Sequence, residues 1–275
     1  MPSNEPRESK AQQRDASRKK ALEMRAAQEK KAKRSRIIAI SGLVAAVAVL
    51  AVVVAVILGQ AKPTAANLDA KTPLKGVTAP AGALANGAIP VGTDGTAGST
   101  SDPKAVTVSV YYDYLCPYCA NFETANAATL DKMASAGDIT VEYHPLAFLD
   151  RASAGTQYST RSAQAIAYVA DADPAHFLAF HEALFANQPA ENTAGLTDDE
   201  IAALAVKAGV PQAVADKIAA DGGKFTTWVT AATAQAQLDK VSGTPTVKIN
   251  GTATDKNVDL YTAGPLEEAI RAAMG

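Results

Sequence analysis

The sequence has few of the residues that hold small domains together by disulfides or metal ions. Its 275 residues include only two cysteines, three histidines and one tryptophan. Cysteines three positions apart close almost no loop, which excludes a scaffold held by disulfides. A structural zinc site needs four ligands, commonly a second cysteine pair or a close histidine pair. His176 and His181 would lie on different faces of a helix, so no metal site is predicted.

Charge is unevenly distributed along the chain, although the formal net charge is only −2. Residues 1–36 contain twelve Lys and Arg against five Asp and Glu, and they include no aromatic residue. Without an aromatic side chain to stack on bases, and without a recognisable binding fold, this segment is not predicted to bind nucleic acid. We interpret it as a basic, solvated cytoplasmic tail.

A long hydrophobic segment follows this tail. Residues 37–59 form an uncharged stretch of 23 residues rich in Val, Ala, Ile and Leu, which is long enough to cross a hydrocarbon core of ~30 Å as a helix. The apolar part of a cleaved signal peptide is usually shorter, so an uncleaved transmembrane helix is favoured over a removed signal. Nine Lys or Arg lie within the twenty residues before the segment and three within the twenty after it. This bias predicts a single-pass membrane protein with a cytoplasmic N-terminus and residues 60–275 outside the cell.

The segment after the predicted membrane helix has the composition of a tether. Residues 60–87 are rich in Ala, Pro, Lys, Thr and Gly without periodicity, and they are predicted to be a flexible linker. Residues 88–91 could form a short edge strand, where Pro90 is tolerated. A single catalytic domain is then expected from residue 88 to residue 275.

The two cysteines lie where a predicted strand is followed by a predicted helix. Residues 106–112 are β-branched and aromatic with a period of two, whereas residues 120–134 carry apolar residues at helical spacing. Pro117 fits the first turn of that helix, so Cys116 is expected at or next to the N-cap. Its sulfur would face unpaired backbone N–H groups and the positive end of the helix dipole, which lowers a cysteine pKa. Cys119, one turn further, is expected to be more buried and less acidic.

The rest of the domain is predicted to be α/β with a helical insertion. Residues 139–144 alternate like a strand, which gives a strand, helix, strand unit and a parallel sheet. Residues from about 156 to 238 are typical of consecutive helices, with no strand candidate between them. The expected closing elements are a strand at 246–249, a turn at Asn250-Gly251, a strand around 252–258 and a helix from 264 onward.

The cysteine segment resembles the signature of a known family. The run Asp113-Tyr114-Leu115-Cys116-Pro117-Tyr118-Cys119-Ala120-Asn121-Phe122-Glu123 is similar to the active site of DsbA-like thiol:disulfide oxidoreductases of the thioredoxin superfamily. The helical insertion also resembles that family, and Gly243-Thr244-Pro245-Thr246 matches its cis-proline loop. The resemblance covers about residues 88–275 and implies a thioredoxin-like fold. It also implies an enzyme with no cofactor other than a redox-active Cys116–Cys119 disulfide.

The resemblance and the predicted anchor together imply a membrane-anchored enzyme that introduces disulfides into exported proteins, because exported compartments are oxidising. Its partners would be reduced or unfolded exported proteins and a membrane or small-molecule oxidant that recycles it. A disulfide reductase or isomerase of the same fold is the alternative, since the Pro117-Tyr118 pair is also found in glutaredoxins. A binding module in which the cysteines are secondary is a third hypothesis.

Other residues are candidates for supporting roles. Tyr118 is expected to shape access to the cysteines, and a cis Thr244–Pro245 bond would leave Thr244 backbone groups free to pair with an extended substrate. Asp113, at the strand end, and Glu123, one turn after Cys119, are candidates for tuning a thiol pKa or relaying protons. A solvated helix position is the alternative for Glu123. Surface or packing positions are expected for His144, His176 and His181.

Overall fold

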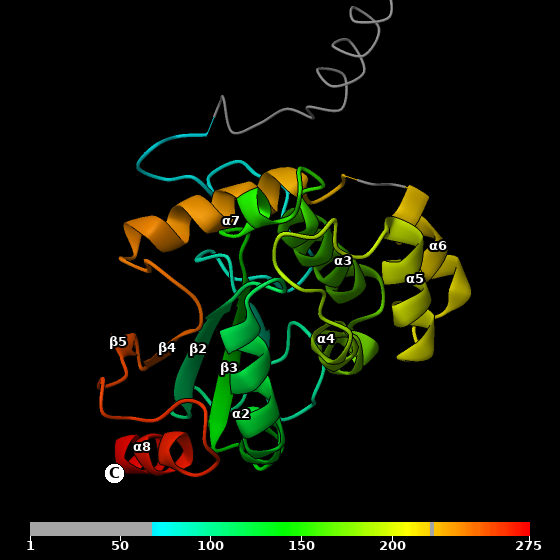
Figure 1. Cartoon of the computed structure of the whole chain (residues 1–275). Helices are drawn as coiled ribbons and strands as arrows, with labels where there is room; N and C mark the ends of the chain where they lie inside the picture. The colour runs from blue at the N-terminus through cyan, green and yellow to red at the C-terminus, as the bar shows by residue number, and fades with distance from the viewer. Residues whose placement is uncertain (1–67, 221–222) are drawn as a thin grey trace, which may run out of the picture. The chain divides into compact units, whose positions relative to one another are not determined.

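The structure is a computed structural model that describes residues 68–220 and 223–275 (Figure 1). Within these two ranges, no helix combines the length and the apolar character that crossing a membrane requires. The predicted tail at residues 1–36, the predicted transmembrane helix at 37–59 and the start of the linker lie outside the described residues. They therefore stay predictions.

A five-stranded sheet organises the described domain, with the strand order β1-β3-β2-β4-β5. The neighbouring strands β2 (Val106–Tyr112) and β3 (Ile139–Pro145) are almost entirely buried and pair in parallel, with Val106 opposite Ile139. Parallel strands need a crossover connection, and helix α2 (Pro117–Ser135) supplies it. The predicted strand, helix, strand unit is thus confirmed.

The remaining strands extend this pair on both sides. The predicted edge strand is β1 (Ile89–Val91), which runs antiparallel to β3. Strand β4 (Thr246–Ile249) runs antiparallel to β2. Strand β5 (Thr252–Ala253) follows the hairpin turn and pairs with β4. The prediction that this last strand continues to about residue 258 is wrong. Asp255 accepts the N–H groups of Asn257 and Val258, which closes a turn and ends the strand.

The chain between β3 and β4 forms the predicted helical insertion. Figure 1 shows α5 and α6 on the side of α3 and α4 that faces away from the sheet, and α7 packs against β3 and α3. Thr197 and Glu200 form the predicted capping box at the start of α5. The helices of the insertion are η1 (Asp150–Ala152), α3 (Tyr158–Ala172), η2 (Pro174–His176), α4 (Phe177–Ala186), α5 (Asp198–Lys207), α6 (Gln212–Ala220) and α7 (Thr226–Leu238).

Two helices outside the insertion cover the sheet. Helix α2 packs against β3, α8 (Pro265–Met274) packs against β2, and the two helices contact each other. The core extends from the sheet into the insertion, where Phe177, Phe180 and Trp228 are fully buried. This confirms that these aromatic residues belong to the helical core, and the continuous core fixes the insertion relative to the cysteine segment.

Residues 68–87 differ from the flexible linker that composition predicted. They form neither helix nor strand, yet the side chains of Leu74 and Val77 pack against the hydrophobic core. The backbone N–H of Ala81 donates a hydrogen bond of 2.9 Å to Asp171 on α3. A few apolar side chains and one backbone contact thus hold this segment to the domain, and neither produces a periodic pattern in the sequence.

Candidate functional site

Cys116 begins the helix that carries both cysteines. It is the N-cap of α2, with extended backbone angles of φ −79° and ψ 114°, and Pro117 occupies the first helical turn. Proline is favoured there because its fixed φ suits the helix and its missing N–H has no partner to lose. The strand residues before Cys116 and the helix residues after it therefore place the sulfur at the helix N-terminus, as the sequence predicted.

The two thiols have opposite electrostatic environments, and both cysteines are free in this structure. The pKa of Cys116 is lowered to about 6, chiefly by a hydrogen bond from the Cys119 thiol. Hydrogen bonds from the side chain of Thr244 and from the backbone N–H groups of Cys119 and Tyr118 also lower it, and burial opposes them. Burial and the proximity of Cys116 raise the pKa of Cys119 far above its usual value. One thiol is thus a thiolate near neutral pH, and the other keeps its proton.

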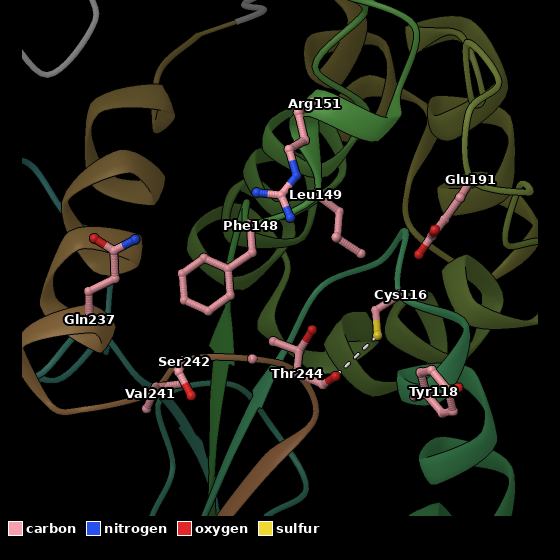
Figure 2. Close-up of a pocket in the computed structure, with 11 residues that line it drawn as sticks. Cys116, Tyr118, Phe148, Leu149, Arg151, Glu191, Gln237, Val241, Ser242 and Thr244 are labelled. Atoms are coloured by element: carbon pink, nitrogen blue, oxygen red, sulfur yellow. Dashed lines mark hydrogen bonds between the residues drawn. The ribbon is translucent and has the colours of Figure 1, made fainter.

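The predicted proline loop lies directly against the reactive sulfur. The Cys116 thiol donates a hydrogen bond of 3.3 Å to the carbonyl oxygen of Thr244 (Figure 2). The Thr244–Pro245 peptide bond is cis. Strand pairing produces this contact, because β4 follows the loop and runs antiparallel to β2, which leads into Cys116.

A cavity of about 430 Å³ opens beside Cys116. Figure 2 shows that Phe148, Arg151 and Gln237 lie across this space from Cys116 and Tyr118. The Tyr118 side chain is 60% exposed, so it borders the entrance. The residues that line the cavity are Cys116, Tyr118, Phe148, Leu149, Arg151, Glu191, Gln237, Val241, Ser242, Gly243 and Thr244.

Asp113 is a buried anchor for two loops that border the cavity. Its carboxyl oxygens accept hydrogen bonds of 2.9 Å from the backbone N–H groups of Leu115 and Leu149. Burial raises the pKa of Asp113 to about 6 against these hydrogen bonds. Its carboxyl group is not among the groups that set the pKa of Cys116. Asp113 therefore lies beside the cysteines. Its carboxyl group holds the two loops, whereas its backbone N–H forms a hydrogen bond that lowers the pKa of Cys119.

Glu123 lies at a largely buried position and pairs with a histidine. Its side chain is 12% exposed, and its carboxylate is 3.3 Å from Nε2 of His181. His181 is buried, and its Nδ1 forms a hydrogen bond of 2.8 Å with the hydroxyl of Tyr114. Tyr112, Tyr143, Phe177 and Phe185 surround the imidazole ring. The expectation that His181 is a packing residue is thus correct, but its link to the cysteine segment was missed.

Gln188 is a second residue that sequence reasoning missed. Its Nε2 donates hydrogen bonds of 2.9 Å to the carbonyl oxygens of both Tyr114 and Cys116. These carbonyl groups lie just before the helix begins, and Gln188 follows α4 in the insertion. The insertion therefore holds the backbone of the reactive cysteine directly. A glutamine in a loop has no spacing or composition that would reveal this role.

Among residues 68–220 and 223–275, no three His, Cys, Asp or Glu side chains are grouped as metal ligands would be. The expectation that the chain uses no metal and no cofactor beyond its cysteine pair stays a prediction. The chemistry that the described geometry offers is that of an acidic thiol beside a protonated thiol, open to a cavity. Such a pair suits thiol–disulfide exchange.

Comparison with known proteins agrees with this geometry. Residues 93–265 match the family model described as Thioredoxin. The curated relatives include the serine/threonine-protein kinase PknE of Mycobacterium tuberculosis strain H37Rv, which is 36% identical over 153 residues. That match covers 54% of this chain and 27% of the relative, so the chain spans about a quarter of the length of the curated relatives it matches.

Solved structures resemble the chain over most of its described residues. MdbA, a thiol-disulfide oxidoreductase from Actinomyces oris, is 25% identical with a TM-score of 0.59, covering 76% of this chain and 96% of that one. Oxidised DsbA from Mycobacterium tuberculosis is 33% identical with a TM-score of 0.53, covering 68% and 100%. Reduced DsbG from the same organism is 35% identical with a TM-score of 0.54, covering 68% and 85%. The chain belongs to the thioredoxin family, and within it to the DsbA-like thiol-disulfide oxidoreductases.

Proposed function

We propose that this enzyme introduces disulfides into exported proteins through Cys116 and Cys119. The opposite pKa shifts of the two thiols are the observation that carries the proposal, because an ionised Cys116 stabilises the reduced form at neutral pH. A dithiol that is stabilised when reduced makes its disulfide a stronger oxidant, by ~30 mV for each ~1.4 kcal/mol in a two-electron couple.

The exchange takes place in two steps. A substrate thiolate attacks the Cys116 sulfur of the enzyme disulfide, the Cys116–Cys119 bond breaks, and Cys119 leaves and takes up a proton. A second substrate thiolate then attacks the substrate sulfur of the mixed disulfide and releases Cys116 as a thiolate. The substrate loses two electrons and the enzyme gains them. Cys116 is a good leaving group in the second step, because a thiol with a low pKa leaves faster.

The loop before β4 supports substrate binding in this mechanism. When Cys116 is a neutral thiol, the Thr244 carbonyl oxygen accepts its hydrogen. A Cys116 sulfur in a disulfide carries no hydrogen, so the same carbonyl oxygen is then free to accept a backbone N–H from an extended substrate. Pro245 fixes this loop beside the sulfur. Tyr118 borders the entry path, where its exposed ring can contact the substrate.

The buried acids Asp113 and Glu123 contact residues that neighbour the cysteines. Asp113 holds the cysteine segment through Leu115 and the cavity wall through Leu149. Glu123 holds His181, whose partner Tyr114 lies two residues before Cys116. We assign to Asp113 and Glu123 the positioning of the cysteine segment, through which they act on the thiol chemistry.

The location follows from the sequence. Residues 37–59 are proposed to anchor the enzyme in the cell membrane, with the N-terminus in the cytoplasm and the catalytic domain outside. The substrates are then reduced or unfolded exported proteins. Each turnover leaves the enzyme reduced, so a membrane-bound or small-molecule oxidant has to restore its disulfide.

Oxidation of a reduced two-cysteine peptide tests the proposed reaction. The oxidised full-length chain should form the peptide disulfide stoichiometrically, and Cys116→Ser should form none. Equal rates for Cys116→Ser and the parent would contradict the proposal. The Pro117-Tyr118 pair is the observation that favours the alternative, a reductase or isomerase. The redox potential, measured by equilibration with glutathione, distinguishes this alternative from the disulfide donor. A potential near the ~−270 mV of thioredoxin would favour the reductase, and a clearly less negative potential would favour the disulfide donor.

A further inference from the structure

Two exposed tyrosines contact each other beside the reactive cysteine. Tyr118 is 60% exposed and Tyr261 is 47% exposed, and their ring centroids are 5.9 Å apart. The other large hydrophobic side chains with high exposure in the described residues are Leu238 and Met274. Aromatic rings that stay in water although they touch each other are typical of contact surfaces for other molecules. We call Tyr118 and Tyr261 the tyrosine pair.

The second tyrosine comes from a distant loop that is held in place. Asn126, buried on α2, donates a hydrogen bond of 2.8 Å from Nδ2 to the carbonyl oxygen of Leu260. The backbone N–H of Tyr261 donates to Asp259 Oδ1 at 2.9 Å. These hydrogen bonds hold the backbone of the loop, from which the half-exposed Tyr261 ring contacts Tyr118. Little conformational entropy is lost when a second molecule contacts a ring that is already in place.

The tyrosine pair continues the surface that a substrate must touch. Burial raises the pKa of Tyr261, and the negative charge of the Cys116 thiolate raises it further, so its phenol lies within electrostatic reach of the reactive sulfur. Tyr118 also lines the cavity beside Cys116, whose opposite wall includes Phe148 and Gln237. A substrate chain bound to Cys116 through its own cysteine therefore contacts the cavity and Tyr118, and Tyr261 extends this surface beyond Tyr118.

Extended backbone geometry places neighbouring substrate residues against this surface. Successive residues of an extended chain are about 3.3 Å apart, and their side chains point to opposite sides. When a substrate cysteine reaches the Cys116 sulfur, the residues one and two positions away from that cysteine also lie at the site. Their side chains point alternately to its two sides. An aromatic or branched aliphatic side chain on the side of Tyr118 would cover both rings, whereas glycine would leave them in water.

We propose that the tyrosine pair selects substrate segments that carry an aromatic or branched aliphatic residue within two positions of the reacting cysteine. This inference rests on the proposed exchange with protein substrates, and Tyr261 is its specificity-determining residue. The phenyl ring of Tyr261 supplies the contact. Tyr261→Phe should therefore keep the selectivity that Tyr261→Ala loses.

The test uses the full-length chain with Cys119→Ser, so that Cys116 is the single thiol and the mixed disulfide accumulates. Two peptides carry one cysteine each, activated as a disulfide with 2-nitro-5-thiobenzoate. They differ only at the residues flanking the cysteine, which are Trp and Leu in one peptide and Gly in the other. The Cys116 thiolate attacks the peptide sulfur and releases the coloured thiobenzoate, whose absorbance gives the rate with each peptide.

The expected result is an apolar-to-glycine rate ratio of about three to ten, from one aromatic contact. Tyr261→Ala should bring this ratio close to one, and Tyr261→Phe should keep it. Met274 is also exposed, at the end of α8, so Met274→Ala serves as the control and should leave the ratio unchanged. A change in Cys116 acidity alone would alter both rates together and leave their ratio unchanged.

A ratio near one in the parent, or a ratio retained by Tyr261→Ala, would overturn the inference. This assay does not depend on the net direction of electron flow, because oxidation and reduction of a substrate pass through the same mixed disulfide. If the oxidised parent fails to oxidise dithiol peptides while the ratio still depends on Tyr261, the proposed disulfide donor is wrong and the selectivity stands.

Discussion

The Cys116 thiol donates a hydrogen bond of 3.3 Å to the carbonyl oxygen of Thr244, although 128 positions separate the two residues. The register of β2 against β4 brings them together, with Tyr111 opposite Thr246. The carbonyl contact holds the loop beside the neutral thiol. The pKa of Cys116 is lowered by the Cys119 thiol, from the same helix, and by the Thr244 side chain, which only the assembled sheet brings there. Both contacts can be tested separately from catalysis.

The first prediction concerns the donor thiol of Cys119. The pKa of Cys116, about 6, is lowered mainly by the hydrogen bond from Cys119. Cys119→Ala removes the donor and should raise the Cys116 pKa, whereas Cys119→Ser keeps a hydroxyl donor and should raise it less. The pH dependence of iodoacetamide alkylation measures both variants. If the alkylation midpoint is unchanged in Cys119→Ala, the prediction is wrong, and the low pKa of Cys116 comes from the helix N-terminus and Thr244.

The second prediction concerns the pH dependence of stability. The pKa of Cys116 in the folded chain, about 6, lies below the ~8.5 expected in the unfolded chain. Its ionisation therefore stabilises the reduced fold fully above about pH 8.5, and this contribution is lost as the pH falls through about 6. The melting temperature of the reduced form, minus that of the oxidised form, should rise between pH 6 and pH 8. Cys116→Ser cannot form the disulfide, so the melting temperature of the reduced parent minus that of Cys116→Ser should rise over the same range. A flat difference in the parent would contradict the prediction.

Local signals were enough to predict the cysteine segment. A strand of β-branched residues, Pro117 at the first helical turn and two cysteines one turn apart each act within a few residues. The position of Cys116 at the N-cap and the opposite pKa shifts of the two thiols followed from them. The cis Thr244–Pro245 bond was expected from the family resemblance and from the low cost of cis X-Pro bonds.

The features that were missed depend on tertiary contacts. Gln188 holds two carbonyl groups more than seventy positions earlier in the chain, and no sequence period relates them. His181 occupies the apolar face of α4 with Phe177 and Phe185 one turn away on either side. The sequence left both a surface and a packing position open for His181, and it did not reveal the partners of the ring. Residues 68–87 resembled a linker because the few apolar side chains that hold them are not periodic.

Gln188 is predicted to be a positioning residue for Cys116. Gln188→Leu removes a donor from the carbonyl oxygens of Tyr114 and Cys116, although the Cys116 oxygen keeps the backbone N–H groups of Cys119 and Ala120. The loss should cost about 1 to 3 kcal/mol in the free energy of unfolding. Because the N-cap backbone then loosens, the Cys116 pKa should also rise. Urea denaturation and alkylation measure the two effects.

Gln212 provides the matched control for this variant. It is exposed on α6 and donates only to Asp216, so Gln212→Leu should change neither stability nor thiol acidity appreciably. If Gln188→Leu loses stability but the Cys116 pKa is unchanged, Gln188 stabilises the fold without positioning Cys116, and the prediction is wrong.

Asp113 is predicted to affect stability more than thiol acidity. Each carboxyl oxygen of Asp113 accepts one backbone N–H, from Leu115 or Leu149. Asparagine has a single acceptor oxygen, so in Asp113→Asn one of these N–H groups faces the NH₂ group, which is also a donor, and loses its hydrogen bond. We expect a loss of about 1 to 3 kcal/mol in the free energy of unfolding, while the alkylation midpoint of Cys116 stays near 6. A large shift of that midpoint would restore a direct electrostatic role for the carboxylate.

The hydroxyl of Tyr114 is predicted to stabilise the site through His181. The two groups are 2.8 Å apart and fully enclosed, so Tyr114→Phe leaves the Nδ1 of His181 without this partner. An unmet hydrogen bond at a buried polar atom costs about 1 to 3 kcal/mol. Urea denaturation should therefore show Tyr114→Phe destabilised by an amount in that range.

Tyr158→Phe is the matched control for Tyr114→Phe. Tyr158 is equally buried, but its hydroxyl has no hydrogen-bond partner among the residues that the structure describes. Removing a buried oxygen without a partner relieves a desolvation cost, so Tyr158→Phe should be neutral or stabilising. Each substitution removes the same atom from a buried ring, so the difference in unfolding free energy between the two variants reports the hydrogen bonds of the Tyr114 hydroxyl. These are the bond of 2.8 Å to His181 and a longer one of 3.4 Å to the Tyr112 hydroxyl. Equal losses in the two variants would show that ring packing, and not these hydrogen bonds, connects the helical insertion to the cysteine segment.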